Sequence, residues 1–201
     1  LACDAAFSVH LLSATLSEPR QIAQRYALDF EVITVVGQRE INYYILDSPE
    51  EVYRLSRDKS WKKLLCFCNM RESVERLAAR LKPMWEPYPV VAHHGSLSKR
   101  LREDAERVMH QASCAICVAT STLEIGIDIG DVDAVVLAET PWSVTSLLQR
   151  VGRGNRRSDT IQAVAVAETD DERRALEAMF EAASTGNLPH EPYNPDVSVA
   201  V

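Results

Sequence analysis

Apolar, β-prone runs alternate with helix-like runs along most of this 201-residue chain, and this alternation constrains its fold more than any other feature. The runs predicted to be strands are 8–12, 31–36, 41–46, 64–68, 88–92, 114–119, 134–138 and 161–167. Between them, apolar residues recur three and four positions apart, as on one face of a helix. Strands that alternate with helices form parallel sheets, because each helix carries the chain back to the same edge. The chain is therefore predicted to be α/β, a three-layer sandwich with a mostly parallel sheet.

The helix-like runs carry their own start and stop signals. Asn69 stands three residues before Glu72, which predicts a capping box at the start of a helix that ends before Pro83. Ser98 is placed to cap the next helix. Further helices are predicted at about 18–26, 144–151 and 170–184.

Composition limits the classes of protein to which the chain can belong. Hydrophobic residues make up 46% and charged residues 25%, which is ordinary for a soluble globular protein. No apolar run approaches the roughly 20 residues that span a membrane, and the first residues lack the basic start of a signal peptide. Five cysteines, an odd number, favour a reducing, cytoplasmic environment. The net charge of −7 means that any phosphate binding must come from local basic clusters.

Cys114 and Cys117 have the spacing of half a zinc site or of a redox pair. They lie in an apolar run that is predicted to be a buried strand, where residues three apart point to opposite faces. No second cysteine pair or histidine pair stands at the usual zinc spacing. We therefore expect no metal site in this chain.

An arginine-rich turn follows the helix predicted over 144–151. The stretch 149–157 holds four arginines and no acidic residue, and its two glycines allow the backbone to bend and lie close to a neighbour. Val144, Leu147 and Val151 belong to the apolar stripe that anchors the preceding helix. Arginine grips phosphate oxygens with paired hydrogen bonds, so the turn is a candidate phosphate site. The alternative is a solvated basic turn.

Polar motifs follow several of the predicted strands. They are Ser13-Ala14-Thr15, Asn69–Arg71, His93–Ser98, Thr120–Asp128 and Glu139-Thr140. In open parallel sheets the carboxyl ends of the strands share one edge, where ligands bind. We therefore expect these motifs to lie together, which favours a functional interpretation of the arginine turn.

The order of these motifs along the chain resembles that of superfamily 2 helicases. The segments that match helicase motifs III, IV, V and VI are 13–15, 69–71, 120–130 and 149–156. The stretches that begin at His93 and Thr120 are most similar to the large helicase-related (Lhr) proteins. The resemblance covers about residues 8–167, and it implies a RecA-like fold, the second of the two lobes of a helicase.

The sequence lacks the phosphate loop and the Asp-Glu-x-His or Asp-Glu-Ala-Asp segment that the family carries in its first lobe. The resemblance thus implies that residues 1–30 are the end of the first lobe, that 31–185 form the second lobe, and that 186–201 are an extended exit segment. Activity is then expected only together with the first lobe and with further domains of a longer protein. The reaction implied is ATP hydrolysis, with Mg²⁺ held mainly by the first lobe.

The resemblance implies a nucleotide site around the arginine turn. Arg153 and Arg156 match the motif VI arginines that reach the γ-phosphate of ATP as catalytic arginine fingers. Gln149 and Arg150 match positions that bridge the lobes or touch the nucleotide. For these two residues the alternative is local packing.

Motif V adds two residues to this implied ATP site. Asp128 matches the acid that accepts a hydrogen bond from the ribose, and Gly126 lies beside it in the same motif. A cap for the following turn is the alternative role for Asp128. The family usually has glycine directly before the last motif VI arginine, where this chain has Asn155; asparagine tolerates the left-handed backbone conformation better than most residues.

A second set of residues is implied in binding single-stranded DNA or RNA. They are Arg71, His94, Gly95, Ser96, Arg102 and Thr120. Thr120 and Arg71 match positions that hold the phosphates of the strand, and Gly95 allows close approach of the backbone. Such contacts position a strand without reading its sequence. The alternative for single residues such as His94 and Thr120 is a local hydrogen bond.

Ser13 and Thr15 match motif III, which couples the nucleotide site to the strand-binding face across the lobes. A second possible function belongs to a different class, a nucleic-acid-binding module without a nucleotide role. The acidic net charge of −7 disfavours that module. The sequence does not distinguish DNA from RNA, and no membrane partner is expected.

Overall fold

The structure is a computed structural model, and it describes residues 10–12, 19–33, 40–123, 129–154 and 160–185. The chain divides into two compact units, one made of Leu1–Gly37 and Leu188–Val201 and the other of Gln38–Asn187. In the first unit the described residues contain one short helix, α1 (Pro19–Ala23), which is shorter than the predicted 18–26. Residues 10–12 and 31–33 are not in strands, contrary to prediction, and the rest of those two runs lies outside the described residues.

The second unit is built on a six-stranded sheet in which every strand pair is parallel. The strands are β1 (Glu40–Leu46), β2 (Lys63–Phe67), β3 (Val90–His93), β4 (Ala115–Ala119), β5 (Ala134–Leu137) and β6 (Thr160–Val166). Their order across the sheet is β1-β6-β5-β2-β4-β3. Strands buried on both faces are expected to be continuously apolar, and β4 and β5 are buried at every residue. The predicted α/β class with a parallel sheet is confirmed.

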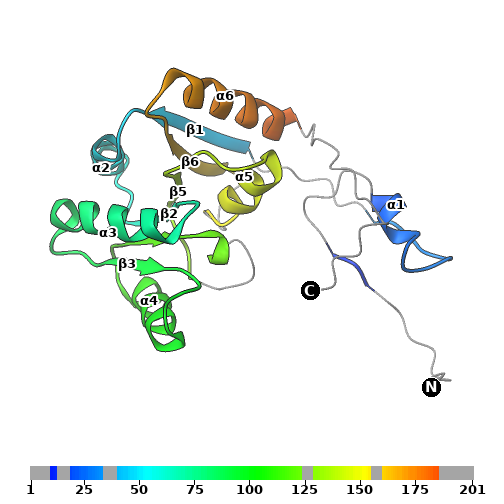
Figure 1. Ribbon diagram of the computed structural model, residues 1–201, viewed down its shortest axis with the longest axis horizontal. Coiled ribbons are helices and arrows are strands. Elements are labelled where there is room, and N and C mark those ends of the chain that lie inside the picture. Colours follow the sequence, from blue (N-terminus) through cyan, green and yellow to red (C-terminus); the bar gives the residue numbers. More distant parts are fainter. Residues whose placement is uncertain (1–9, 13–18, 34–39, 124–128, 155–159, 186–201) are drawn as a thin grey trace. The chain divides into compact units, whose positions relative to one another are not determined.

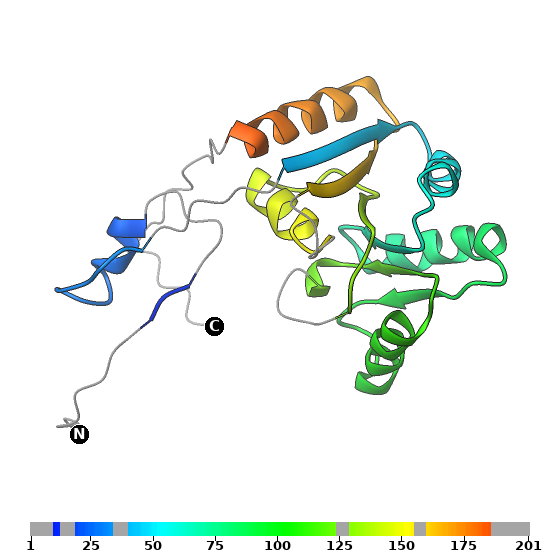
Figure 2. The ribbon, with the colours of Figure 1, turned by 180° about the vertical axis from the view of Figure 1, so that it is seen from behind.

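Helices cover both faces of this sheet (Figures 1 and 2). They are α2 (Pro49–Asp58), α3 (Arg71–Trp85), α4 (Lys99–Gln111), α5 (Val144–Val151) and α6 (Asp170–Thr185). One core cluster joins apolar residues of α2 and α3 to alternate residues of the central strands. The buried residues of α5 and α6, such as Leu147 and Phe180, lie outside that cluster. The result is the predicted three-layer arrangement.

Helix α2 was not predicted from the sequence, although its start signals are present. Pro49 stands at the first helical position, and Glu50 and Glu51 lie in the first turn. Proline and acidic residues both favour the amino end of a helix. The Glu51 carboxylate also accepts a hydrogen bond from the backbone N–H of Asp47 at 2.8 Å, which closes the first turn.

Helix α3 departs from the prediction at both ends. It begins at Arg71 after Met70, and no side chain caps it, so the predicted capping box at Asn69 is wrong. It also runs through Pro83 to Trp85. Trp85 is buried and packs edge-on against Tyr53, with ring centroids 5.4 Å apart. This burial holds the last turn in place although a proline inside a helix costs about 3 kcal/mol.

Within the part of the chain that the structure describes, no helix is both long enough and apolar enough to cross a membrane.

Candidate functional site

The carboxyl ends of the parallel strands bring several of the predicted motifs to one edge of the sheet. Asn69–Arg71 follow β2, His94–Ser96 follow β3, Thr120 follows β4 and Glu139-Thr140 follow β5. These four strands are neighbours in the sheet, in the order β5-β2-β4-β3. The predicted grouping of these motifs is confirmed. Ser13 and Thr15, the motif III pair, lie outside the described residues.

Asn69 joins three of the elements at this edge. Its backbone N–H donates to Oε2 of Glu139 at 2.6 Å, and its Nδ2 donates to the carbonyl oxygen of Thr140 at 2.9 Å. Its Oδ1 accepts a hydrogen bond from Nη1 of Arg150 at 3.0 Å. Asn69 therefore connects the loop after β2 with the loop after β5 and with helix α5. The sequence signal for this role is a polar residue directly after a buried strand, a signal that equally predicts a helix cap.

Arg150 lies inside the lobe. The residue is 1% exposed, and its guanidinium lies over the ring of Phe67, 5.6 Å from the ring centroid. A cation over an aromatic face is attracted by the ring electrons, and the attraction grows when water is excluded. Through these contacts Arg150 attaches α5, the helix to which it belongs, to Phe67 at the end of β2. Gln149, the neighbouring residue, is exposed.

Helix α5 is anchored as its apolar pattern predicted. Val144, Leu147 and Val151 are buried. Ser143 caps the start of the helix, and its Oγ accepts a hydrogen bond from the N–H of Ser146 at 3.1 Å. A side-chain oxygen in this position satisfies one of the free N–H groups at the start of a helix. The helix therefore anchors the first residues of the turn, 152–154, whose N–H groups bond back to its last carbonyls.

The turn after α5 lies directly against the sheet. A Cβ atom on Gly154 would lie 3.1 Å from Cγ2 of Val135 and 3.5 Å from Cγ2 of Ile161. The close approach predicted for a glycine of this turn is thus real, and the neighbours are β5 and β6. Arg153 is half-buried, and its N–H donates to the carbonyl of Arg150 at 3.0 Å. Asn155 and Arg156 lie outside the described residues.

A loop after β3 and the start of α3 meet at the same edge. Nη1 of Arg71 donates to Oγ of Ser96 at 3.3 Å, and the Arg71 side chain is 63% exposed. Nη1 of Arg102 donates to the carbonyl oxygens of Gly95 and Leu97, at 3.2 Å and 2.8 Å. Arg102 therefore shapes this loop, in addition to bringing positive charge to it.

The charge of Arg71, beside this loop, is paired with the neighbouring carboxylate of Glu72. The hydrogen bond from Arg71 to Glu72, 2.7 Å long, holds the pKa of the Glu72 carboxyl below its usual value. The same pair raises the pKa of Arg71, chiefly through that hydrogen bond. Arg71 stays charged at any physiological pH, as a phosphate ligand must.

The two histidines before the loop are buried, and each meets a glutamate of a different helix. Nε2 of His93 lies 3.0 Å from Oε1 of Glu106 in α4, and Nε2 of His94 lies 2.8 Å from Oε1 of Glu75 in α3. Nδ1 of His94 is buried, and no described residue forms a hydrogen bond with it. The two pairs fix the end of β3 between α3 and α4, and the pairing of His93 was not foreseen from the sequence.

Thr120 links the ends of β3 and β4. Its N–H donates to the carbonyl of His93 at 3.2 Å, and its carbonyl accepts from the N–H of Leu123 at 3.3 Å. The structure thus brings Arg71, His94, Gly95, Ser96, Arg102 and Thr120 to one region. Gly126 and Asp128, the motif V residues, lie outside the described part of the chain.

Three of the four cysteines in the described residues are buried, and the fourth, Cys114, is half-buried. Burial raises the pKa of Cys117 to about 12, and burial also raises that of Cys68 to about 12. Cys114 precedes β4 and is half-buried, whereas Cys117 is fully buried within that strand. In the described ranges, no group of three or more histidine, cysteine or acidic residues is placed to hold a metal ion.

Comparison with known proteins agrees with this arrangement. Residues 47–158 match the family of the helicase conserved C-terminal domain. The ATP-dependent helicase Lhr-Core of Sulfolobus acidocaldarius is 35% identical over 185 residues, which cover 80% of this chain and 21% of that protein. The Lhr-Core helicase of Methanocaldococcus jannaschii is 38% identical over 163 residues, which cover 73% of this chain and 19% of that protein. The chain therefore spans about a fifth of the length of these relatives.

Solved structures share the fold. The Mycobacterium smegmatis helicase Lhr, bound to ssDNA and AMP-PNP, superposes with a TM-score of 0.64 at 28% identity, over 80% of this chain and 24% of that one. The helicase MrfA, bound to DNA and AMPPNP, gives a TM-score of 0.69 at 21% identity, over 92% of this chain and 29% of that one. The family match covers more than half of the chain, and the parallel sheet and the motif order agree with it. The chain belongs to the superfamily 2 helicases, as a helicase C-terminal domain with a RecA-like fold.

Proposed function

We propose that this chain is the second lobe of an Lhr-like, ATP-dependent helicase or translocase, and that it needs a first RecA-like lobe to hydrolyse ATP. The observation that carries the proposal is the hydrogen bond between Arg150 and Asn69. It ties the helix that leads to the arginine turn to the loop that leads to Arg71. A lobe with these two surfaces held together can serve a nucleotide and a nucleic acid at once.

The nucleotide surface is assigned to the arginine turn. Arg153 and Arg156 extend toward the γ-phosphate of ATP and stabilise the negative charge that develops during its transfer to water. The anchoring of α5 and the contact of Gly154 with β5 and β6 support this role for Arg153, because a residue that is already held in place loses little freedom when it meets a phosphate. Asp128 and Gly126 would contact the ribose side of ATP, and Gln149, which is exposed, would face the nucleotide or the first lobe.

Arg150 is assigned to the same surface as a positioning residue. Its burial and its contacts with Asn69 and Phe67 favour a role inside the lobe. It would hold α5 in the position from which Arg153 and Arg156 reach the nucleotide. Mg²⁺ would be held mainly by the first lobe, together with the phosphates of ATP.

The nucleic-acid surface is assigned to the edge formed by the loops after β2, β3 and β4. Arg71 and Thr120 would hold phosphates of a single strand of DNA or RNA, and Gly95 and Ser96 would let the backbone approach it closely. His94 and Arg102 would keep the loop in shape, as their contacts with Glu75 and with the loop carbonyls suggest.

Movement of the lobe along a strand would follow because its nucleotide surface and its nucleic-acid surface are attached to each other. ATP bound between two lobes favours a closed state because it contacts both, and hydrolysis removes that preference. Since Asn69 joins α5 to the loop before Arg71, the two surfaces of this lobe would move as one body. The strand contacts would then advance along the phosphate backbone with each cycle. Residues 1–30 would belong to the first lobe and help to transmit closure through Ser13 and Thr15.

A direct test is the Arg156→Ala substitution in a longer chain that includes the first lobe. ATP turnover is expected to fall by about 10³-fold or more, as for other arginine fingers, while affinity for single-stranded DNA stays within about twofold. Arg107→Ala, which removes an exposed arginine paired with Asp104, is the matched control and should leave both unchanged. Unchanged turnover in the Arg156 variant would remove the finger assignment.

A nucleic-acid-binding module without a nucleotide role is the second candidate, because the loop of Arg71 and Ser96 is complete within this chain. That module would bind single strands tightly on its own, with an affinity that falls steeply with salt. Titration of the 201-residue chain with labelled single strands distinguishes the two. Tight binding that is lost with Arg71→Ala but unaffected by ATP in the longer chain would favour the module.

A further inference from the structure

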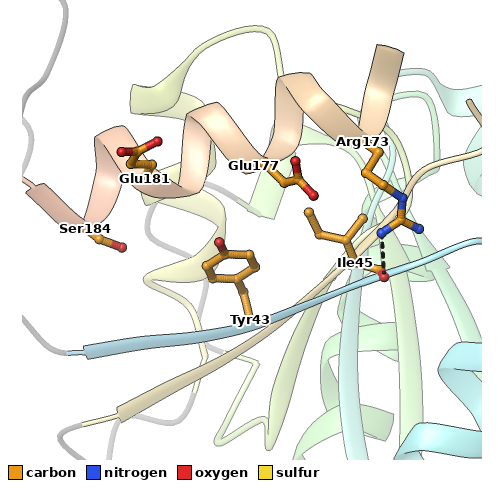
Figure 3. Close-up of a pocket in the computed structure, with 6 residues that line it drawn as sticks. All are labelled: Tyr43, Ile45, Arg173, Glu177, Glu181 and Ser184. Atoms are coloured by element: carbon orange, nitrogen blue, oxygen red, sulfur yellow. Dashed lines mark hydrogen bonds between the residues drawn. The ribbon is translucent and has the colours of Figure 1, made fainter. Parts of the chain in front are cut away.

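A pocket of about 500 Å³ lies between strand β1 and helix α6, away from the edge that carries Arg71 and Ser96 (Figure 3). Its lining residues are Tyr43, Ile45, Arg173, Glu177, Glu181 and Ser184. β1 and β3 are the two outer strands of the sheet, so the pocket and the loop after β3 are separated by the full width of the sheet. The pocket plays no part in the function proposed above.

The pocket opens beside an unpaired strand edge. The carbonyl oxygen of Leu46 accepts a hydrogen bond from the N–H of Ala167, next to β6, at 2.9 Å. Backbone groups of successive residues in a strand point to alternate sides, so those of Ile41, Tyr43 and Ile45 point away from β6. No strand among the described residues pairs with this side of β1.

Arg173 closes the edge at one end. Its Nη1 donates to the carbonyl oxygen of Ile45 at 3.2 Å, and its Nη2 lies 2.5 Å from Oδ1 of Asp47 (Figure 3 shows the first of these bonds). The Arg173 charge is therefore balanced by Asp47, and the Ile45 carbonyl is satisfied. Among the described residues, nothing bonds to the N–H and carbonyl groups of Ile41 and Tyr43, and strand groups of this kind are a template for another strand.

The wall of the pocket suits a cation. Glu177 and Glu181 lie one turn apart on α6, and neither carboxylate forms a hydrogen bond or an ion pair within the described residues. Figure 3 shows Glu177 pointing from α6 toward β1. The ring of Tyr43 stacks on Phe180, with centroids 4.2 Å apart and planes inclined by 3°, so its orientation is fixed. Carboxylates next to an aromatic ring bind guanidinium and ammonium groups.

We propose that the β1 edge and this pocket bind an extended basic segment of a partner protein. The segment adds to the sheet as a strand beside Ile41 and Tyr43. It places an arginine or lysine side chain on the α6 side of the sheet, against Glu177 and Glu181. Main-chain hydrogen bonds give such strand addition its affinity, and side-chain pockets give it specificity. The two carboxylates exclude a nucleic-acid backbone as the occupant, because both would be negatively charged.

The charge requirement is tested with two short labelled peptides and the 201-residue chain. One peptide is acetyl-Thr-Val-Arg-Val-Thr-amide, and the other has glutamate in place of arginine. Fluorescence anisotropy should show binding of the arginine peptide alone. The double variant Glu177→Gln and Glu181→Gln should weaken it by about fivefold, as expected for the loss of two exposed charges. The matched double variant Glu86→Gln and Glu103→Gln, elsewhere on the lobe, should change it by less than twofold.

The strand requirement is tested by amide hydrogen exchange of the same complex. The N–H groups of Ile41 and Tyr43 should become protected when the arginine peptide binds, whereas those of Asn42 and Tyr44, which already face β6, should not change. Binding that protects other amides, or equal binding of both peptides, would overturn the proposal. So would a concentration-dependent dimer that protects Ile41 and Tyr43 without peptide, because the occupant would then be a second copy of the chain. Both glutamates are exposed, so the double variant is expected to fold.

Discussion

At the scale of single residues, the fold depends on a few polar side chains that are buried and paired. Arg150 is 1% exposed, lies over Phe67 and bonds to Asn69, so one guanidinium fixes the end of β2 against α5. Buried charges are costly unless they are paired, and their removal leaves the partner unsatisfied. The same residue type at Arg71 is exposed and faces the candidate strand-binding loop. The two arginines therefore differ in burial: Arg150 is packed inside the fold, whereas Arg71 is exposed to solvent.

Replacement of Arg150 by alanine should therefore destabilise the chain. Loss of the hydrogen bond to Asn69 and of the contact with Phe67 is expected to lower the free energy of unfolding by about 3 kcal/mol. Chemical denaturation with urea measures this change. Arg107→Ala removes an exposed ion pair with Asp104 and should cost less than about 1 kcal/mol. Equal unfolding midpoints for the two variants would mean that Arg150 has no structural role.

At the scale of helices and strands, local sequence signals and tertiary burial compete. Helix α3 continues past Pro83 because Leu81 and Trp85 are buried on one face, while Pro83 itself is exposed. Burial of one aromatic side chain contributes on the order of 2–3 kcal/mol, comparable to the cost of the proline. In the strands, local sequence and tertiary burial agree, because continuous apolar runs already predict burial on both faces of the sheet.

Pro83→Ala should stabilise the chain, because the substitution restores a backbone N–H to an exposed helix position. We expect the free energy of unfolding to rise by about 1–3 kcal/mol. Pro87→Ala, outside the helix, serves as the comparison and should give no such gain. A loss of stability in the Pro83 variant would show that the proline supports the local geometry of α3.

The buried thiols of the sheet give the lobe a pH dependence on the alkaline side. The pKa of Cys68 and that of Cys117 are raised to about 12 by burial, from an ordinary value of 9.0. The unfolded chain loses these protons first, so stability is full below pH 9 and falls as pH rises toward 12. The fall is at most about 1.4 kcal/mol per pH unit for each thiol. Cys117→Ala should show a shallower decline between pH 9 and 10.5 in denaturant titrations, and an identical decline would contradict the assignment.

At the scale of the whole chain, sequence predicted the sheet better than its connections. The six described strands coincide with predicted runs to within two residues at their ends, because runs such as 64–68 and 134–138 are continuously apolar. Helix α2 was missed although Val52 is buried and Tyr53 and Leu55 pack beside it, because this apolar side extends over only about one turn. The network of Asn69, Glu139 and Arg150 was also missed, because it joins residues 70 to 81 positions apart. Hydrogen bonds between residues so far apart in the sequence leave no local pattern from which they could be predicted.

ATP turnover by a longer chain that carries the first lobe, measured with and without single-stranded DNA or RNA, decides whether this lobe works in a motor. We expect turnover that one of these strands stimulates, with the stimulation reduced when Arg71 is replaced by alanine. The absence of turnover, with both lobes folded and nucleic acid still bound, would contradict the motor and leave this lobe as a binding module.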